Sequence, residues 1–154
     1  CSQSRGLGDV YKRQAISYGG KMAAIDKRTG NRLWQKNISG VETPWVAGDI
    51  VYVLSSDYQL LAMNKFDGSV FWITELKKFD DVNKSKNALR WTGPILAGNR
   101  LIVFGTKGHV AEINPIDGSL MSQWKTGKTV HIAPVVAGKT LYLLSEDGTL
   151  SAYR

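Results

Sequence analysis

The sequence predicts an all-β protein, and more specifically part of a β-propeller made of four-stranded antiparallel blades. Two observations support this fold class. A segment containing a proline and an Ala-Gly pair recurs along the chain, with Pro44, Pro94 and Pro134 spaced 50 and 40 residues apart. The 154 residues also include 16 Gly and five Trp, a combination typical of repeated β units with glycine turns. Apolar residues show no helical spacing, which excludes a helical solenoid.

Three strands of each unit follow from the recurring segment. The Ala-Gly pair predicts a hairpin turn between the first strand and an apolar stretch, and a polar turn then leads into a third short strand. The apolar stretch is hydrophobic on both faces and must therefore be covered on both sides. A sheet packed between copies of itself is a propeller blade. The first segments are 43–49, 93–99 and 133–139; the apolar stretches are 50–54, 101–104 and 141–144; the third strands are 60–64, 110–114 and 150–153.

A second recurring element predicts the fourth strand. An Asp or Asn opens a turn and accepts a backbone N–H, a Gly takes a positive φ, and a strand with a tryptophan follows. Because the tryptophans recur at one position, we expect them to pack a blade against its neighbour or against this turn, not to stack on a cofactor or a base. The turns are 26–30, 64–68 and 114–118, and the predicted docking residues are Trp34, Trp72, Trp124, Gly30, Gly68 and Gly118.

The repeat divides the chain into about three and a half blades. The string from Arg5 to Gln14 resembles a translated sequencing adapter, so residues 1–14 are predicted to be extraneous. The remaining boundaries are a partial blade at 15–40, a blade at 41–76, an inserted loop at 77–90, a blade at 91–127, and a last blade without its outer strand at 128–154.

Composition excludes several functions. One cysteine cannot form an internal disulfide, the Cys and His content offers no four-ligand zinc site, and no apolar run is long enough to span a membrane. The net charge is +7, and the inserted loop contributes five positive and two negative charges. No aromatic side chains alternate with its lysines, so a nucleic-acid partner is not predicted. No phosphate loop or catalytic motif appears, and we predict no catalytic, metal or cofactor site.

Four residues are candidates for binding a partner. They lie just before the first strands of the blades, where the repeat predicts that they surround one mouth of a central channel. Loops at such a rim commonly bind partners. The candidates are Glu42, Arg90, Trp91 and His131.

The tryptophan repeat resembles that of the quinoprotein-type, or PQQ-like, β-propellers. Its pattern, Ala-x-Asp/Asn followed by Thr/Asp-Gly and Trp, occurs at 24–34 and 62–72, while the third copy has Glu112 in place of Ala and its Trp124 comes later. Over residues 15–154 the chain resembles the C-terminal part of the BamB family of outer-membrane protein assembly factors, closest to its alphaproteobacterial branch. The segments that carry this resemblance are 20–26, 43–49, 90–94 and 146–154.

This resemblance implies a non-catalytic scaffold within an eight-bladed propeller. It would bind a BamA-type barrel-assembly subunit through rim loops, contact unfolded outer-membrane proteins, and act on the periplasmic face of the outer membrane. Contact with the membrane itself would be through a lipid anchor outside this sequence. Catalytic quinoproteins hold their quinone against a vicinal-cysteine disulfide, which a single cysteine excludes. A fragment of a PQQ-dependent dehydrogenase and a PQQ-like ligand-sensing domain are the alternatives.

Overall fold

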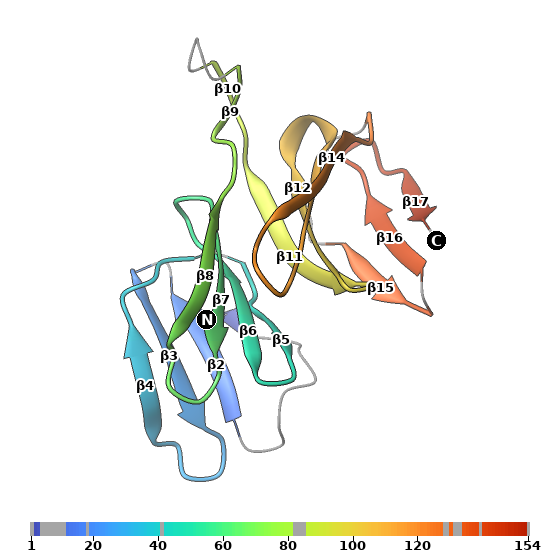
Figure 1. Ribbon diagram of the computed structural model, residues 1–154. Helices are drawn as coiled ribbons and strands as arrows, with labels where there is room; N and C mark the ends of the chain where they lie inside the picture. Colours follow the sequence, from blue (N-terminus) through green and yellow to red (C-terminus); the bar gives the residue numbers. More distant parts are fainter. Residues whose placement is uncertain are drawn as a thin grey trace. The chain divides into compact units, whose positions relative to one another are not determined.

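The computed structural model describes residues 2–3, 12–17, 19–40, 42–81, 86–127, 130, 134–138 and 140–153. This part of the chain contains β-strands, one short 3₁₀ turn at Thr106–Gly108 and no α-helix. The chain forms two compact units, Cys1–Glu75 and Leu76–Arg154. Antiparallel strands follow one another in sequence order within each sheet (Figure 1), which confirms the predicted all-β blade architecture.

The first unit contains two four-stranded sheets, which we call blade 1 and blade 2. Their strand orders are β1-β2-β3-β4 and β5-β6-β7-β8, so each is a meander. Strand β2 begins at Lys12, inside the segment predicted to be extraneous; that prediction stays untested. The strands are β1 (Ser2–Gln3), β2 (Lys12–Ser17), β3 (Lys21–Asp26), β4 (Arg32–Lys36), β5 (Trp45–Ala47), β6 (Ile50–Leu54), β7 (Gln59–Asn64) and β8 (Val70–Glu75).

The second unit contains blade 3, blade 4 and a separate hairpin. Blade 3 has four strands, and blade 4 has three among the described residues. The segment predicted to be an inserted loop holds the hairpin, β9 (Phe79–Asp81) paired with β10 (Lys86–Ala88). Blade 3 comprises β11 (Trp91–Ala97), β12 (Arg100–Gly105), β13 (His109–Ile113) and β14 (Leu120–Lys125); blade 4 comprises β15 (Val135–Ala137), β16 (Thr140–Leu144) and β17 (Leu150–Tyr153).

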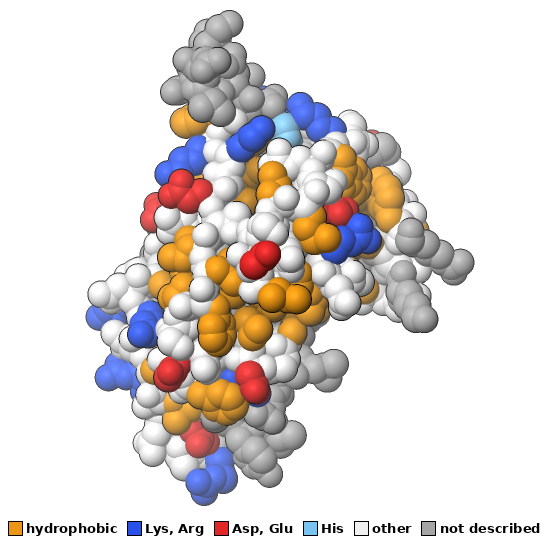
Figure 2. Space-filling view, in the orientation of Figure 1, with side chains coloured by type: hydrophobic (Ala, Val, Ile, Leu, Met, Phe, Trp, Pro, Cys, Tyr) orange, Lys and Arg blue, Asp and Glu red, His pale blue; other side chains and the backbone are white. Residues whose placement is uncertain are grey.

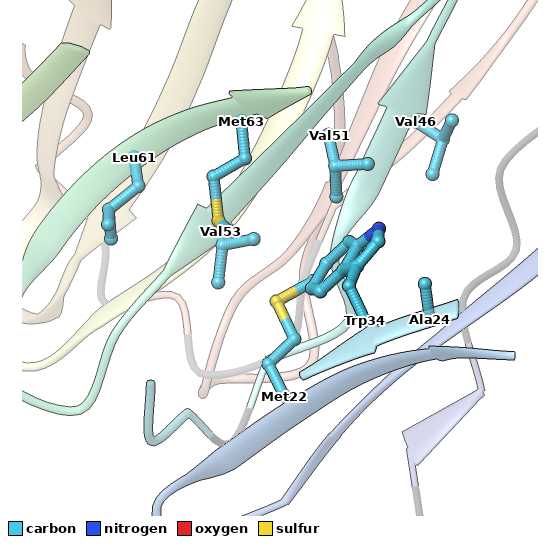
Figure 3. Close-up of a cluster of buried hydrophobic side chains, with 8 residues drawn as sticks. All are labelled: Met22, Ala24, Trp34, Val46, Val51, Val53, Leu61 and Met63. Atoms are coloured by element: carbon cyan, nitrogen blue, oxygen red, sulfur yellow. The ribbon is translucent and has the colours of Figure 1, made fainter. Parts of the chain in front are cut away.

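The core of the first unit lies between its two blades. Side chains alternate across β6, so that Val51 and Val53 are on one face and Tyr52 and Leu54 on the other, and all four are buried. This strand is therefore covered on both sides, as its apolar sequence predicts. Figure 3 shows the cluster on the face toward blade 1: Met22, Ala24 and Trp34 of blade 1 with Val46, Val51, Val53, Leu61 and Met63 of blade 2.

Blade 4 differs from blade 2 on one face. In the strand registers, Tyr142 occupies the position of Tyr52 and Leu144 that of Leu54. Tyr52 and Leu54 are 3% and 2% exposed, whereas Tyr142 and Leu144 are 37% and 42% exposed. The opposite face of β16, with Leu141 and Leu143, is buried. One apolar face of blade 4 is thus open in this chain.

Candidate docking turns and partner-binding rim

The turn between β7 and β8 is built by short side chains that bond to its own backbone. Asn64 Oδ1 accepts the Phe66 N–H at 2.8 Å, and Gly68 has a φ of 71°. Asp67 Oδ1 accepts both the N–H and the hydroxyl of Ser69, at 2.8 and 2.7 Å. The backbone bond from Ser69, followed by the hydroxyl bond, lowers the pKa of Asp67 below its ordinary value.

The turn after β13 repeats this geometry. Asn114 Oδ1 accepts the Ile116 N–H at 3.0 Å, and Gly118 has a φ of 75°. The hydroxyl of Ser119, followed by its N–H, lowers the pKa of Asp117. Two distant stretches of sequence therefore form the same turn because they supply the same Asn, Asp, Gly and Ser at the same spacing.

Trp34 of blade 1 contacts the β7–β8 turn of blade 2. Its indole N–H donates to the Lys65 carbonyl at 2.9 Å in a buried position. A Cβ atom added to Gly68 would lie 2.9 Å from Trp34 Cδ2 and Cε3, closer than any side chain can approach. The ring therefore occupies the space that every residue except glycine would fill, and we interpret this contact as the docking that the repeat predicts.

Lys65 holds the acceptor of this bond in place. Its ammonium lies 2.9 Å from Asp49 Oδ1, and its own N–H donates to the Asp49 carbonyl at 2.9 Å. The Lys65 side chain is 7% exposed, so the ammonium is removed from most of the solvent, while the partner carboxylate is largely exposed. Bonds at both ends of Lys65 thus fix the carbonyl that receives Trp34.

The other two tryptophans have different surroundings. Trp72 lies opposite Ala62, as Trp34 lies opposite Ala24, and its ring centroid is 6.0 Å from that of Tyr52. Burial raises the pKa of the Tyr52 phenol. Trp124 lies opposite Val110, two residues further along its strand, because Glu112 pairs with Ser122.

Trp124 bonds to a side chain instead of a turn. Its indole N–H donates to Glu112 Oε1 at 3.1 Å, and Arg100 binds the other oxygen of that carboxylate at 3.0 Å. The Glu that replaces alanine in the third copy of the repeat is therefore the acceptor for the displaced tryptophan. Gly30, the remaining predicted docking residue, has a φ of 74° and no described atom within 4 Å of an added Cβ.

The predicted rim residues precede or begin the first strands of blades 2, 3 and 4 in the chain. There the entering segment bonds to the turn between the second and third strands. In blade 2 the Ser56 N–H donates to the Ser39 carbonyl at 2.9 Å, and in blade 3 Thr106 and Arg90 exchange two bonds, of 2.9 and 3.1 Å. In blade 4 Val130 forms a bridge with Ser145. The rim segments are thus held by backbone bonds in three blades.

The four predicted rim residues differ in what they offer a partner. Glu42, in the first unit, is half-buried, and Arg90, in the second, is exposed. Trp91 is 5% exposed. His131 lies outside the described residues. Of the described three, Arg90 offers the most accessible side chain.

Trp91 anchors the hairpin to blade 3. Its indole N–H donates to the Lys77 carbonyl at 2.7 Å, and the fully buried Leu89 donates its N–H to the Lys78 carbonyl at 2.9 Å. The ring lies edge-on to His109, with centroids 6.5 Å apart, and over Gly105, where an added Cβ would be 3.2 Å from the indole. Sequence reasoning placed Trp91 at the rim but did not foresee that it fixes the base of the hairpin.

The described part of the chain gives no indication of a membrane helix or a metal site. Within those residues no helix is long and apolar enough to cross a membrane. The same residues contain no group of three or more His, Cys, Asp or Glu side chains that could hold a metal ion.

Comparisons with known proteins agree with the repeat. The family described as "Outer membrane protein assembly factor BamB" matches residues 8–74 and 75–154. The BamB of Alkalilimnicola ehrlichii is 28% identical over 141 residues, which cover 91% of this chain and 34% of that protein. The chain therefore spans about a third of the length of such curated relatives.

Solved structures show the same fold. The crystal structure of BamB from Moraxella catarrhalis matches with a TM-score of 0.79 and 22% identity, over 95% of this chain and 42% of that one. The quinohemoprotein alcohol dehydrogenase from Comamonas testosteroni matches with a TM-score of 0.61 and 21% identity, over 74% of this chain and 19% of that one.

Proposed function

The chain belongs to the BamB family of outer-membrane protein assembly factors, and from this we propose that it is part of a non-catalytic propeller scaffold that binds a BamA-type barrel-assembly subunit. The family match, which extends over both units, is the observation that carries the proposal. The scaffold would help outer-membrane proteins to insert, would contact their unfolded chains, and would act on the periplasmic face of the outer membrane.

The geometry of the rim supports a binding role. Partners bind most readily to surfaces that need little ordering, because ordering side chains and loops reduces affinity. Here the segments that enter blades 2 and 3 are bonded to neighbouring turns through Ser39 and Arg90. The side chain of Arg90 is exposed and its backbone is held by these bonds, so Arg90 can contact a partner directly with little loss of conformational freedom.

A binding assay tests the proposal. The 154-residue chain is passed over the immobilised periplasmic part of the BamA-type subunit from the same organism, with a full-length relative and its own subunit as positive control. We expect saturable binding that weakens at least about tenfold with Arg90→Ala, the size of a 1.4 kcal/mol loss. Arg28→Ala, in an exposed turn of blade 1, is the matched control and should leave binding unchanged. Absence of binding by the unaltered chain, with the positive control intact, would contradict the proposal.

A further inference from the structure

Four cations lie around the base of the β9–β10 hairpin and are not used by the docking turns. Lys77, Lys78, Arg90 and Lys107 all have exposed side chains, and none of them forms an ion pair with another described residue. Figure 2 shows Lys and Arg side chains gathered beside a histidine in the upper part of the view. We call these four residues the basic patch.

The contacts around Trp91 bring the basic patch together. Trp91 binds the carbonyl of Lys77, and the residue before Arg90, Leu89, binds the carbonyl of Lys78. Arg90 in turn bonds through its backbone to Thr106, the neighbour of Lys107. These bonds hold residues 77–78 and residue 107, which are about thirty residues apart in the sequence, at the same end of blade 3.

The sequence around the patch has a net positive charge, even when the exposed Glu75, two residues before Lys77, is counted. Residues 77–90 include Asp80 and Asp81 and still sum to +3, and Lys107 adds one more positive charge. Glu112, the acidic residue of β13, is already paired with Arg100. A net positive charge held on a fixed backbone favours a partner that supplies carboxylates.

We propose that the basic patch docks an acidic surface of the protein partner, an inference that rests on the proposed function and specifies the chemistry of its contact. Three apolar side chains beside the patch, Leu76, Leu89 and Trp91, are 6%, 0% and 5% exposed, and Phe79 is half-buried. None of the four is fully exposed for insertion among lipid chains, as peripheral membrane binding usually requires. Because the backbone that carries these cations is already fixed, they can pair with carboxylates of a protein partner at defined positions without a large ordering cost.

Charge reversal with a matched control tests the inference. The patch variant carries Lys77→Glu, Lys78→Glu and Lys107→Glu, and the control carries Lys21→Glu, Lys27→Glu and Arg28→Glu on exposed positions of blade 1. Both variants lower the net charge from +7 to +1, since three reversals subtract six. Association with the immobilised BamA-type subunit is measured at about 50 mM and about 500 mM salt, where screening differs strongly. Circular dichroism verifies that both variants keep the β spectrum.

The inference predicts that the patch variant associates at least about tenfold more slowly at low salt and that the difference shrinks at high salt. The control variant should associate at nearly the unaltered rate. Equal effects of the two variants, or no effect of either, would overturn the inference while leaving the proposed function intact. Binding to vesicles that contain anionic phospholipid is measured in parallel, and loss of vesicle binding with unchanged subunit binding would also overturn it. If the unaltered chain does not bind the subunit, the proposed function and this inference fail together.

Discussion

Replacing Trp34 with phenylalanine isolates the bond that joins blade 1 to the turn of blade 2. The substitution keeps an aromatic ring and removes the N–H that donates to the Lys65 carbonyl at 2.9 Å. A buried carbonyl left without its partner costs about 1–3 kcal/mol. The smaller ring also loses contact over Gly68. We therefore expect Trp34→Phe to lower the free energy of unfolding by about 2 kcal/mol, and Trp34→Ala by about 3–5 kcal/mol.

Urea unfolding followed by circular dichroism measures this loss. With a denaturant slope of about 2 kcal/mol/M, the midpoint should fall by about 1 M for Trp34→Phe. Trp124→Phe is the matched control, because its indole donates to a Glu112 carboxylate that keeps its bond to Arg100. We expect that control to cost less than about 1 kcal/mol. Equal costs for the two substitutions, or a Trp34→Phe midpoint within error of the unaltered chain, would refute the docking interpretation.

Four further predictions follow from individual contacts. Gly68→Ala should destabilise by about 2–4 kcal/mol, from its positive φ and its clash with Trp34, whereas Gly48→Ala, also at positive φ but in open space, should cost about 1 kcal/mol in the same urea assay. Leu54→Ala should cost about 2–5 kcal/mol and Leu144→Ala at its exposed equivalent less than about 1 kcal/mol; similar unfolding midpoints would show that the face of blade 4 is covered. Because the pKa of Asp67 is lowered in the folded chain, its carboxylate stabilises the fold at pH values above its ordinary pKa of 3.8, and this stabilisation is lost as the pH falls. The urea midpoint of Asp67→Asn should therefore differ from that of the unaltered chain at about pH 6, and the difference should vanish by about pH 2. Trp91→Phe should speed amide exchange at Leu89, whose N–H bonds to Lys78, and unchanged exchange would show that Trp91 does not anchor the hairpin.

Much of the fold is predictable because the same turn residues and the same apolar stretch recur in each repeat. The turns at 64–68 and 114–118 require an Asn or Asp acceptor and a glycine, and both form as expected, with φ of 71° and 75° at their glycines. The apolar stretch at 50–54 predicts burial on both faces, which β6 shows. Periodic features of this kind are visible in one sequence without any relative to compare.

Features that depend on distant contacts were not predictable. Nothing in the local sequence indicates that Trp91 bonds to Lys77, fourteen residues earlier, or that the 77–90 segment pairs as β9 and β10. Glu112 pairs with Ser122 in the same register as Ala62 with Trp72, but the sequence did not indicate that Glu112 accepts the N–H of the displaced Trp124. The basic patch combines residues from two separate stretches, and the charge count of the insertion revealed only one of them.

The candidate rim was partly accessible from sequence. The repeat places Arg90 just before a first strand, and the structure shows that the backbone of Arg90 bonds to Thr106. The repeat could not distinguish the exposed Arg90 from Trp91, the buried first residue of β11, because both precede the proline of the repeat. As partner contacts, all four residues remain predictions.

The most direct test of the scaffold role is site-specific photocrosslinking in cells that produce the protein. A photoreactive amino acid replaces Arg90 or Lys107 of the basic patch, or Arg28 in blade 1 as the control. The account predicts a crosslinked product that contains the BamA-type subunit from positions 90 and 107 and none from position 28. Crosslinks to that subunit from position 28 alone, or from none of the three with normal protein levels, would contradict it.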